Sequence, residues 1–230
     1  MRYDRQTMLP EIGEEGQAKL KNAKVLIVGV GGLGSPISLY LTAAGVGTIG
    51  LIDDDVVSLT NLQRQVLYTE AEIGKSKVLC AAKRLKALNS EVDIHTYATR
   101  LCKENALQLI SSYDLVVDGC DNFATRYLIN DVCKSLNKPY IYGAICGLDG
   151  QVSVFNIGEH PKEYRDLYPN EEEVLQMTPP SKGVVGVTPA IVGSMEANEV
   201  IKIVCGFGSI LVGKIWTIDL RTGETNIFLL

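Results

Sequence analysis

Four glycines near the start of the chain have the spacing of a phosphate-binding turn. The run Gly29-Val30-Gly31-Gly32-Leu33-Gly34 fits the pattern G-x-G-x-x-G, with an apolar run at 24–28 before it and a helical pattern at 35–44 after it. The amide groups of such a turn lie at the amino end of a helix, where they can bind phosphate. Asp53 ends the next apolar run, and a carboxylate there can accept both ribose hydroxyls of an adenosine. This order predicts an adenine nucleotide site rather than a turn whose glycines serve only tight helix–strand packing.

Charged residues beyond Asp53 distinguish ATP from NAD. The glycine turn alone does not, since by itself it would favour a dehydrogenase. Arg64 and Lys77, together with the amides of Asn61 and Gln65, are placed to converge near the end of the same strand. Two cations and two amides match the high negative charge of a triphosphate better than the lower charge of a dinucleotide pyrophosphate. The sequence therefore favours ATP, and an NAD-dependent oxidoreductase is the alternative enzyme class.

A further acidic residue follows another apolar run of the chain. Asp121 and Asn122 come shortly after the predicted strand at 114–118, at the edge of an open α/β sheet where ligands bind. The carboxylate of Asp121 could hold Mg²⁺ on the phosphates, because Mg²⁺ prefers oxygen ligands. Taken singly, these residues have plain alternatives: Arg64 and Lys77 could be surface charges, and Asp121 could be the N-cap of the helix that starts at 122.

Strand and helix patterns alternate along the chain and predict the scaffold that positions these residues. The predicted strands are 24–28, 48–52, 92–97, 114–118, 140–143, 151–155, 211–219 and 224–229, and the predicted helices are 35–44, 75–89, 104–111, 122–136 and 189–205. This alternation predicts an α/β fold: a Rossmann-like, doubly wound, largely parallel sheet with helices on both faces and closing C-terminal strands. We expect residues 1–230 to form a single domain.

One segment, 157–182, departs from this alternation. It is polar, contains the run Glu171-Glu172-Glu173, and holds four of the eight prolines. Loops of that length in a compact domain are usually functional or disordered. We therefore expect a mobile crossover loop, which could order over a bound tail and exclude water from a hydrolysable intermediate.

Composition limits the partners and the location of the protein. The 22 basic and 27 acidic residues give a net charge of −5, so we expect no nucleic-acid partner and no membrane partner. The uncharged stretch 25–52 is long enough to span a bilayer, but seven glycines and Pro36 interrupt it. The six cysteines include no C-x-x-C pair, and the polar start of the chain does not resemble a signal peptide. We expect a cytoplasmic protein with reduced thiols.

Five motifs together resemble those of the MoeB/ThiF/HesA family, the bacterial relatives of ubiquitin-activating enzymes. They are Arg2-Tyr3-x-Arg5-Gln6, Gly29-x-Gly31-Gly32-Leu33-Gly34-Ser35, Asp53-x-Asp55-x-Val57-x-Leu59-x-Asn61-Leu62-Gln63-Arg64-Gln65, Gly74-Lys75-x-Lys77 and Asp121-Asn122. The resemblance covers nearly the whole chain and implies a homodimeric, ATP-dependent adenylyltransferase that uses Mg²⁺. Its substrate would be the C-terminal Gly-Gly carboxylate of a ubiquitin-like sulfur-carrier protein, ThiS- or MoaD-like, which it adenylates with release of pyrophosphate.

The resemblance also implies a role for each motif residue. Arg5, Arg64, Lys77 and Asp121 would be catalytic, with Arg5 reaching the phosphates of the neighbouring subunit. The nucleotide would be bound by Gly29, Gly31, Gly32, Gly34, Asp53, Asp55, Asn61, Arg64, Gln65, Lys77, Asp121 and Asn122. The chemistry agrees, because a terminal carboxylate with a pKa of about 3.5 is ionised at pH 7 and needs no general base.

A structural zinc is one family feature that the sequence does not support. Many relatives hold this zinc with two C-x-x-C pairs, one of them in the crossover. Here the crossover has Glu163-Tyr164-Arg165-Asp166, with acids at both thiolate positions, and no second pair occurs. Two carboxylates do not make a tetrahedral thiolate site, so we expect no structural zinc.

A nucleophilic cysteine is the second missing feature. Some relatives carry it in the crossover, where this chain has Thr178-Pro179-Pro180-Ser181-Lys182-Gly183. We therefore expect the enzyme to stop at the acyl-adenylate and to pass it to a separate sulfur donor or to the thiol of a partner. Cys120 and Cys146 lie near predicted strand ends and could substitute, although a buried core position is typical of such cysteines. A carrier-binding module without catalysis is a further alternative, and the pathway served, thiamine, molybdopterin or another, stays open.

Overall fold

The computed structural model describes residues 1–177 and 183–230 of the chain. Its strands are β1 (Lys24–Val28), β2 (Thr48–Ile52), β3 (Asp93–Tyr97), β4 (Leu115–Asp118), β5 (Tyr140–Cys146), β6 (Asp149–Phe155), β7 (Lys214–Asp219) and β8 (Glu224–Leu229). They form one eight-stranded sheet in the order β3-β2-β1-β4-β5-β6-β7-β8. Neighbouring strands are parallel from β3 to β5 and antiparallel from β5 to β8. The structure therefore confirms the predicted α/β fold with its closing C-terminal strands.

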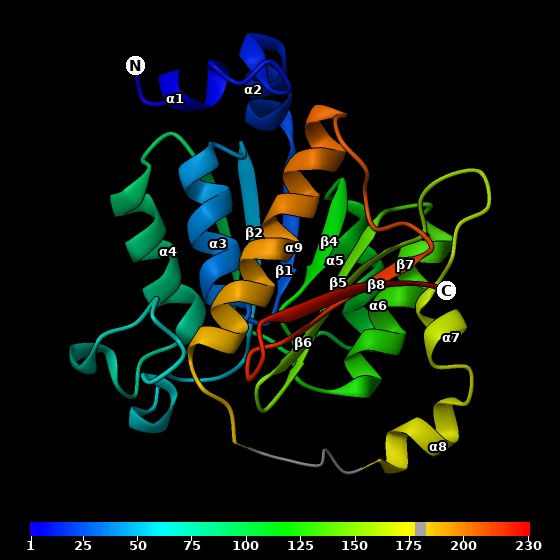
Figure 1. Ribbon diagram of the computed structural model, residues 1–230. Helices are drawn as coiled ribbons and strands as arrows, with labels where there is room; N and C mark the ends of the chain where they lie inside the picture. The colour runs from blue at the N-terminus through cyan, green and yellow to red at the C-terminus, as the bar shows by residue number, and fades with distance from the viewer. Residues whose placement is uncertain (178–182) are drawn as a thin grey trace.

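Helices cover both faces of this sheet (Figure 1). They are α1 (Asp4–Thr7), α2 (Gly13–Asn22), α3 (Gly34–Ala44), α4 (Lys77–Leu88), α5 (Lys103–Ser111), α6 (Phe123–Ser135), α7 (Tyr164–Leu167), α8 (Glu171–Gln176) and α9 (Val187–Cys205), with 3-10 turns η1 (Leu59–Asn61) and η2 (Glu70–Glu72). On one face α3 packs against α4 and α9, and on the other α5 packs against α6. Val25 and Ile27 of β1 belong to the core on the α3 side, whereas Leu26 and Val28 belong to the core on the α6 side. Burial on both faces explains why β1 is a continuous apolar run.

The parallel strands end level with one another. Val28 of β1 pairs with Ile52 of β2 and with Asp118 of β4. The turns that follow these three strands therefore start at the same edge of the sheet. Gly29 has a φ of 89°, and a side chain on Gly119 would clash with the carbonyl oxygen of Gly29. Two neighbouring turns are thus in direct backbone contact, which only glycine allows at these positions.

The composition of the crossover predicts a loop over its whole length. The structure instead places two short helices, α7 and α8, within 157–182. The Tyr164 ring anchors α7. It is fully buried and packs against the rings of Tyr127, Tyr140, Tyr142, Phe155 and Tyr168. Packing between segments so far apart in the sequence is not visible in local composition. Residues 178–182 lie outside the described residues, and the mobility of the crossover stays a prediction.

Several element boundaries differ from those that the sequence predicts, among them the starts of β6 (149 instead of 151) and of α4 (77 instead of 75). β5 continues to Cys146 instead of ending at 143, β7 begins at 214 instead of 211, and α9 begins at 187 instead of 189. The longer β5 matters for the site, because Ala144 joins the sheet opposite Gln151, and Cys146 joins it opposite Asp149. Nowhere in the described ranges is a helix both long enough and apolar enough to cross a bilayer.

Candidate functional site

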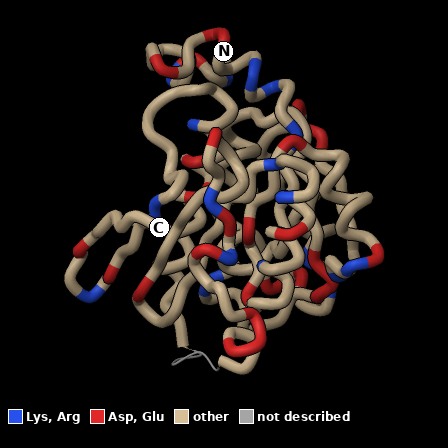
Figure 2. Tube along the Cα trace, turned by 90° about the vertical axis from the view of Figure 1, so that its right-hand side faces the viewer, with Lys and Arg blue, Asp and Glu red and all other residues tan. Residues whose placement is uncertain are grey.

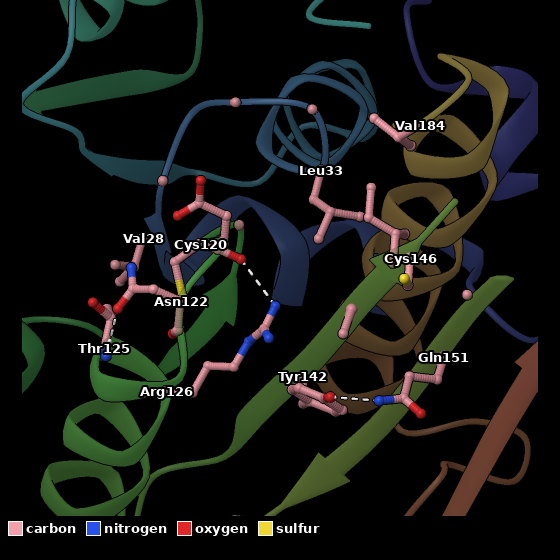
Figure 3. A pocket seen from close by; sticks show the side chains of 18 of the residues that line it. Val28, Leu33, Cys120, Asn122, Thr125, Arg126, Tyr142, Cys146, Gln151 and Val184 are labelled. Carbon is pink, nitrogen blue, oxygen red and sulfur yellow. Dashed lines mark hydrogen bonds between the residues drawn. The ribbon is translucent and has the colours of Figure 1, made fainter. Parts of the chain in front are cut away.

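A cavity of about 1020 Å³ opens at the carboxyl ends of β1, β2 and β4 and extends over β5, β6 and β7 (Figure 3). It has two parts. The turn half is lined by Gly29, Gly31, Gly32, Asp53, Asp55, Arg64, Gln65, Lys77, Asp121 and Asn122, and the antiparallel half is lined by Tyr142, Ala144, Cys146, Gln151, Tyr168 and Thr217. Among the described residues, Arg5, Gly34 and Asn61 do not reach the cavity wall. Most of the predicted nucleotide residues therefore lie together, and these three do not.

The glycines of the turn divide into two pairs with different roles. A side chain on Gly34 would clash with the carbonyl oxygen of Gly29, so these two glycines permit the tight passage from strand to helix. A Cβ atom on Gly31 would have only the Gln65 side chain nearby, with its closest atom 3.4 Å away, and Gly32 would meet Pro189 at 3.3 Å. Backbone contact therefore explains Gly29 and Gly34, whereas Gly31 and Gly32 line the cavity, with Gly32 also packed closely on Pro189.

Asp53, Asp55 and Lys77 form the charged floor of the turn half. The Asp53 carboxylate accepts the backbone N–H groups of Val30 at 2.8 Å and Asp55 at 2.9 Å, which fixes it beside the glycine turn. The Lys77 ammonium lies 2.7 Å from the Asp55 carboxylate, and only 5% of the Lys77 side chain is exposed. Lys77 is thus not a surface charge. The carboxylates of Asp53, Asp54 and Asp55 offer oxygen atoms within 4.8 Å of one another.

The segment after η1 places Arg64 and Gln65 in the wall but leaves Asn61 outside it. Arg64 is half-buried, and its Nη1 donates to the Thr60 carbonyl at 3.1 Å. Gln65 is 4% exposed, and its Oε1 has no hydrogen-bond partner in the described part of the chain. Asn61 Oδ1 accepts the backbone N–H of Ser58 and so stabilises η1. The Asn61 side chain thus has a capping role here, and its contact with the nucleotide stays a prediction.

Asp121 and Asn122 begin the helix α6 in different ways. Asn122 is the N-cap, since its Oδ1 accepts the Thr125 N–H at 2.9 Å. The alternative that Asp121 caps this helix is therefore wrong. Asp121 lies one residue earlier, is exposed in the cavity, and makes no hydrogen bond or ion pair with any residue that the structure describes. Its carboxylate is available to a cation, whereas Asn122 holds the start of the helix.

Arg5 lies far from the cavity of its own chain. The ring of Tyr3 packs on Gly45 at the end of α3, and its hydroxyl accepts the Asn89 amide at 2.8 Å. Gly45 precedes β2, so this arm lies at the amino ends of the parallel strands, opposite the cavity. Figures 1 and 2 both show the N-terminus at one end of the molecule. Arg5 is exposed there, and its predicted action on a neighbouring subunit stays a prediction.

A buried ion pair beneath Asp121 is the main feature that the sequence reasoning missed. Asp118, fully buried, accepts the Arg126 Nε at 3.0 Å and the Tyr140 hydroxyl at 2.9 Å. Its other oxygen accepts the Cys120 N–H and thiol. Burial and the neighbouring Asp118 raise the pKa of the Cys120 thiol well above its usual range. Arg126 could have been noticed as a lone charge among the apolar positions of α6.

The two candidate cysteines have different surroundings. Cys120 is buried, as predicted for a core cysteine. Cys146 is half-buried and lines the cavity, so the core interpretation is wrong for it. The strand β5 runs three residues further than the sequence predicts, and Cys146 lies at its end, on the cavity edge. Nearby, Gln151 Nε2 donates to the Tyr142 hydroxyl at 2.6 Å and to the Tyr168 hydroxyl at 3.2 Å (Figure 3).

The chain is similar in sequence to known adenylyltransferases. Over 226 residues the chain is 47% identical to the sulfur carrier protein adenylyltransferase of Thermus thermophilus, covering 95% of this chain and 82% of that protein. It is 50% identical to the probable molybdopterin-synthase adenylyltransferase of Pyropia yezoensis, covering 99% of this chain and 60% of that protein. Other curated relatives are likewise longer, and the chain spans 50 to 57% of their length.

Solved structures show the same fold. The crystal structure of Escherichia coli MccB with ATP superimposes with a TM-score of 0.86 at 26% identity, covering 100% of this chain and 70% of that one. The crystal structure of PaaA superimposes with a TM-score of 0.85 at 25% identity, covering 99% and 72%. The ThiF family model matches residues 3–230, which include the glycine turn, the cavity and the closing strands. On this match and the identities above, the chain belongs to the ThiF family.

Proposed function

We propose that this protein uses ATP to adenylate the C-terminal Gly-Gly carboxylate of a ubiquitin-like sulfur-carrier protein, ThiS- or MoaD-like. The observation that carries the proposal is a single cavity that joins a cationic turn half, with Arg64 and Lys77, to an antiparallel half suited to an extended peptide. The names of the Thermus and Pyropia relatives support the same activity. We further propose that residues 1–230 act as one adenylation domain in the cytoplasm.

The turn half offers the groups that a triphosphate needs. Gly31 and Gly32 leave room for phosphate oxygens at the amino end of α3. The Lys77 ammonium can exchange Asp55 for a phosphate, and Arg64 supplies a second cation. Asp53 is held by backbone N–H groups at both oxygens, in place for ribose hydroxyls. The ATP-bound structure of the neighbour MccB supports ATP as the cosubstrate.

Mg²⁺ fits the donor set of the same half. Asp121 presents an exposed carboxylate in the cavity with no competing partner among the described residues, and carboxylate oxygens are ligands that Mg²⁺ prefers. When bound, the ion would neutralise part of the phosphate charge. Asn122 contributes indirectly, because its cap of α6 holds the residue before it in place.

The reaction itself needs positioning more than proton transfer. One carboxylate oxygen of the tail attacks the α-phosphorus, an O–P bond forms, and the bond to the bridging oxygen breaks. Pyrophosphate leaves with that electron pair. The attacking carboxylate is already ionised at pH 7, so no residue has to remove a proton. Arg64 and Lys77 hold the phosphates in line, which is the larger part of catalysis in phosphoryl transfer.

In a homodimer, Arg5 could reach the cavity of the partner subunit, because it lies far from the cavity of its own chain. Exposed apolar side chains support a second subunit: Tyr40 on α3 is 58% exposed, Leu79 on α4 is 59% exposed, and Val66 is 62% exposed. Mixing Arg5→Ala subunits with Lys77→Ala subunits tests the arrangement. Recovery of activity in the mixture is expected if Arg5 acts on the partner, and no recovery would contradict it.

The acyl-adenylate would pass to a separate sulfur donor. The sequence 178–182 contains no cysteine, and Cys120 is buried with a raised pKa, which makes its thiol a poor nucleophile. Cys146 is the cysteine of the antiparallel half. We expect Cys146→Ala to keep full pyrophosphate exchange and no covalent adduct to form between carrier and enzyme. An adduct that disappears in this variant would overturn the proposal of adenylation alone.

ATP–pyrophosphate exchange tests the activity directly. Candidate carriers ending in Gly-Gly are added one at a time, and exchange is expected only with the right carrier and is lost in Asp121→Ala. Binding of a carrier without exchange would favour a non-catalytic module instead. Thermal shifts with ATP and NAD separate the two enzyme classes, because a ligand of the native state raises the melting temperature. Stabilisation by NAD and not by ATP would contradict adenylation.

A further inference from the structure

Arg126 lies at the boundary between the two halves of the cavity. It belongs to the first turn of α6, just beyond Asp121, and it also lines the cavity. Its Nη2 donates to the Cys120 carbonyl at 3.0 Å on the turn side and to the Gly143 carbonyl at 3.2 Å on β5. One nitrogen therefore connects the loop that carries Asp121 to the strand that begins the antiparallel half.

The orientation of the Arg126 guanidinium is fixed from several directions. Its Nε donates to the buried Asp118 carboxylate. Its central carbon lies 5.4 Å from the Tyr142 ring centroid and 5.9 Å from that of Phe123. Two rings, a carboxylate and two carbonyls leave the planar group little freedom. Such pre-organisation is typical of groups that bind a ligand in one geometry.

One donor of this group remains unused. Arg126 is only 7% exposed, and its Nη1 makes no hydrogen bond with any residue in the described ranges. Nε and Nη2 are taken by protein groups, so Nη1 is the nitrogen that Arg126 can offer to the cavity. In Figure 3 the side chain lies between Cys120 on one side and Tyr142 on the other. Nη1 is not among the fully buried polar atoms that lack a partner in the described part of the chain, so it is open to the cavity and can donate to an anion bound there.

We propose, on the basis of the proposed function, that Arg126 binds the terminal carboxylate of the carrier tail through Nη1. The phosphates have Arg64 and Lys77 in the turn half, whereas Arg126 contacts Tyr142 and Gly143 of β5, where a tail would arrive. A single donor can hold one carboxylate oxygen and leave the other free to attack the α-phosphorus. Asp118 already balances the Arg126 charge, so the contact orients the carboxylate more than it attracts a multiply charged group.

Binding of carrier without ATP tests this contact apart from the chemistry. The carrier that supports pyrophosphate exchange is prepared with its natural C-terminal carboxylate and with a C-terminal carboxamide. We expect the wild-type protein to bind the carboxylate form about 10- to 100-fold more tightly, the ratio typical of a hydrogen bond to a charged group. In Arg126→Lys, which keeps a charge beside Asp118, the preference should shrink severalfold because the fixed planar geometry is lost.

Two control variants distinguish this contact from general effects. Arg84→Lys makes the same change on the exposed side of α4 and should leave the preference intact. Arg64→Lys should weaken ATP binding and also leave the preference intact. If Arg126→Lys does not fold, the double variant Asp118→Asn/Arg126→Gln removes both buried charges together and should abolish the preference.

The outcomes of these measurements show whether Arg126 contacts the tail carboxylate or only stabilises the fold. Equal binding of the two carrier forms by the wild-type protein, or an unchanged preference in Arg126→Lys, would overturn the role of Arg126 while exchange still supports adenylation. A structural role alone would lower the melting temperature without changing the preference. If no carrier supports exchange, the proposed function fails and this inference fails with it.

Discussion

The two halves of the cavity are built in contrasting ways. The turn half follows strands such as β1, whose residues 25–28 are buried, and its turn is fixed by the backbone contact between Gly29 and Gly34. The antiparallel half lies over β5, β6 and β7, and the sheet ends in β8, which is exposed at all six residues. Its wall consists of side chains such as Gln151 and Tyr168. Local backbone geometry therefore determines the nucleotide part, whereas long-range register determines the part assigned to the carrier tail.

We expect the largest loss of activity when Lys77, the buried cation of the turn half, is replaced. We expect Lys77→Ala to lower the rate of pyrophosphate exchange about 100- to 1000-fold, the usual cost of removing one pre-organised group that stabilises developing charge. Lys103→Ala changes the same residue type at the exposed start of α5, outside the cavity lining, and should leave the rate unchanged. Equal rates for the two variants would mean that the turn half does not bind the reacting phosphates.

Two glycines of one turn should respond differently to the same substitution. Gly34→Ala places a methyl group against the Gly29 carbonyl and should lower the unfolding free energy by roughly 1–3 kcal/mol. Gly31→Ala meets only the Gln65 side chain, so it should change stability by less than about 0.5 kcal/mol but weaken ATP binding. Urea denaturation and ATP titration measure the two effects. Destabilisation by Gly31→Ala with unchanged ATP affinity would remove the distinction between packing and phosphate-facing glycines.

The same contrast explains which features the sequence predicts. Gly31, Asp53, Lys77 and Asp121 follow strands directly or stand at fixed spacing after them, so a linear pattern identifies them. Arg126 is different, because its partners lie on β4 and β5 and its importance appears only when those strands are paired.

Register accounts for the rest of what the sequence does not reveal. Gln151 faces the cavity because it pairs with Ala144 across β5 and β6, and Tyr142 is placed by its pairing with Ser153. The helix α7 is held because Tyr164 packs into an aromatic core that α6, β5 and β6 supply. Asn61 shows that a polar residue within a recognisable motif can also form a local cap, which its spacing in the motif does not reveal.

The buried carboxylates of Asp118 and Glu196 differ in their hydrogen bonds, and the pH dependence of the unfolding free energy can test this difference. Asp118 has four hydrogen bonds, whereas Glu196 of α9 is fully buried and neither oxygen has a partner in the described part of the chain. Burial, together with the charge of Asp118, raises the pKa of Glu196 well above its usual 4.5, although Arg126 opposes the shift. The folded protein therefore keeps this proton at pH values where the unfolded chain has lost it.

The sign of the pH effect follows from this difference. Above about pH 4.5 the unfolded chain binds fewer protons at Glu196, so the unfolding free energy should fall by about 1.4 kcal/mol per pH unit until the folded pKa is reached. Glu196→Gln should remove this contribution, making the variant gain stability relative to the wild type between pH 5 and pH 8. Urea denaturation at a fixed protein concentration measures the difference. A difference that does not change with pH would mean that Glu196 is ionised in the folded state.

The smallest effect concerns the aromatic cluster that attaches the crossover to the antiparallel half. The Tyr164 hydroxyl is buried without a hydrogen-bond partner among the described residues, so Tyr164→Phe should keep the unfolding free energy or raise it by up to about 1 kcal/mol. Tyr127→Phe removes a hydroxyl that donates to the Tyr168 carbonyl at 2.8 Å and should lower it by about 1 kcal/mol. The opposite signs matter, because both variants keep the ring and differ only in whether the lost hydroxyl was bonded. If Tyr164→Phe is the more damaging variant, the hydroxyl of Tyr164 has a partner in solution, and the crossover is held by that bond as well as by ring packing.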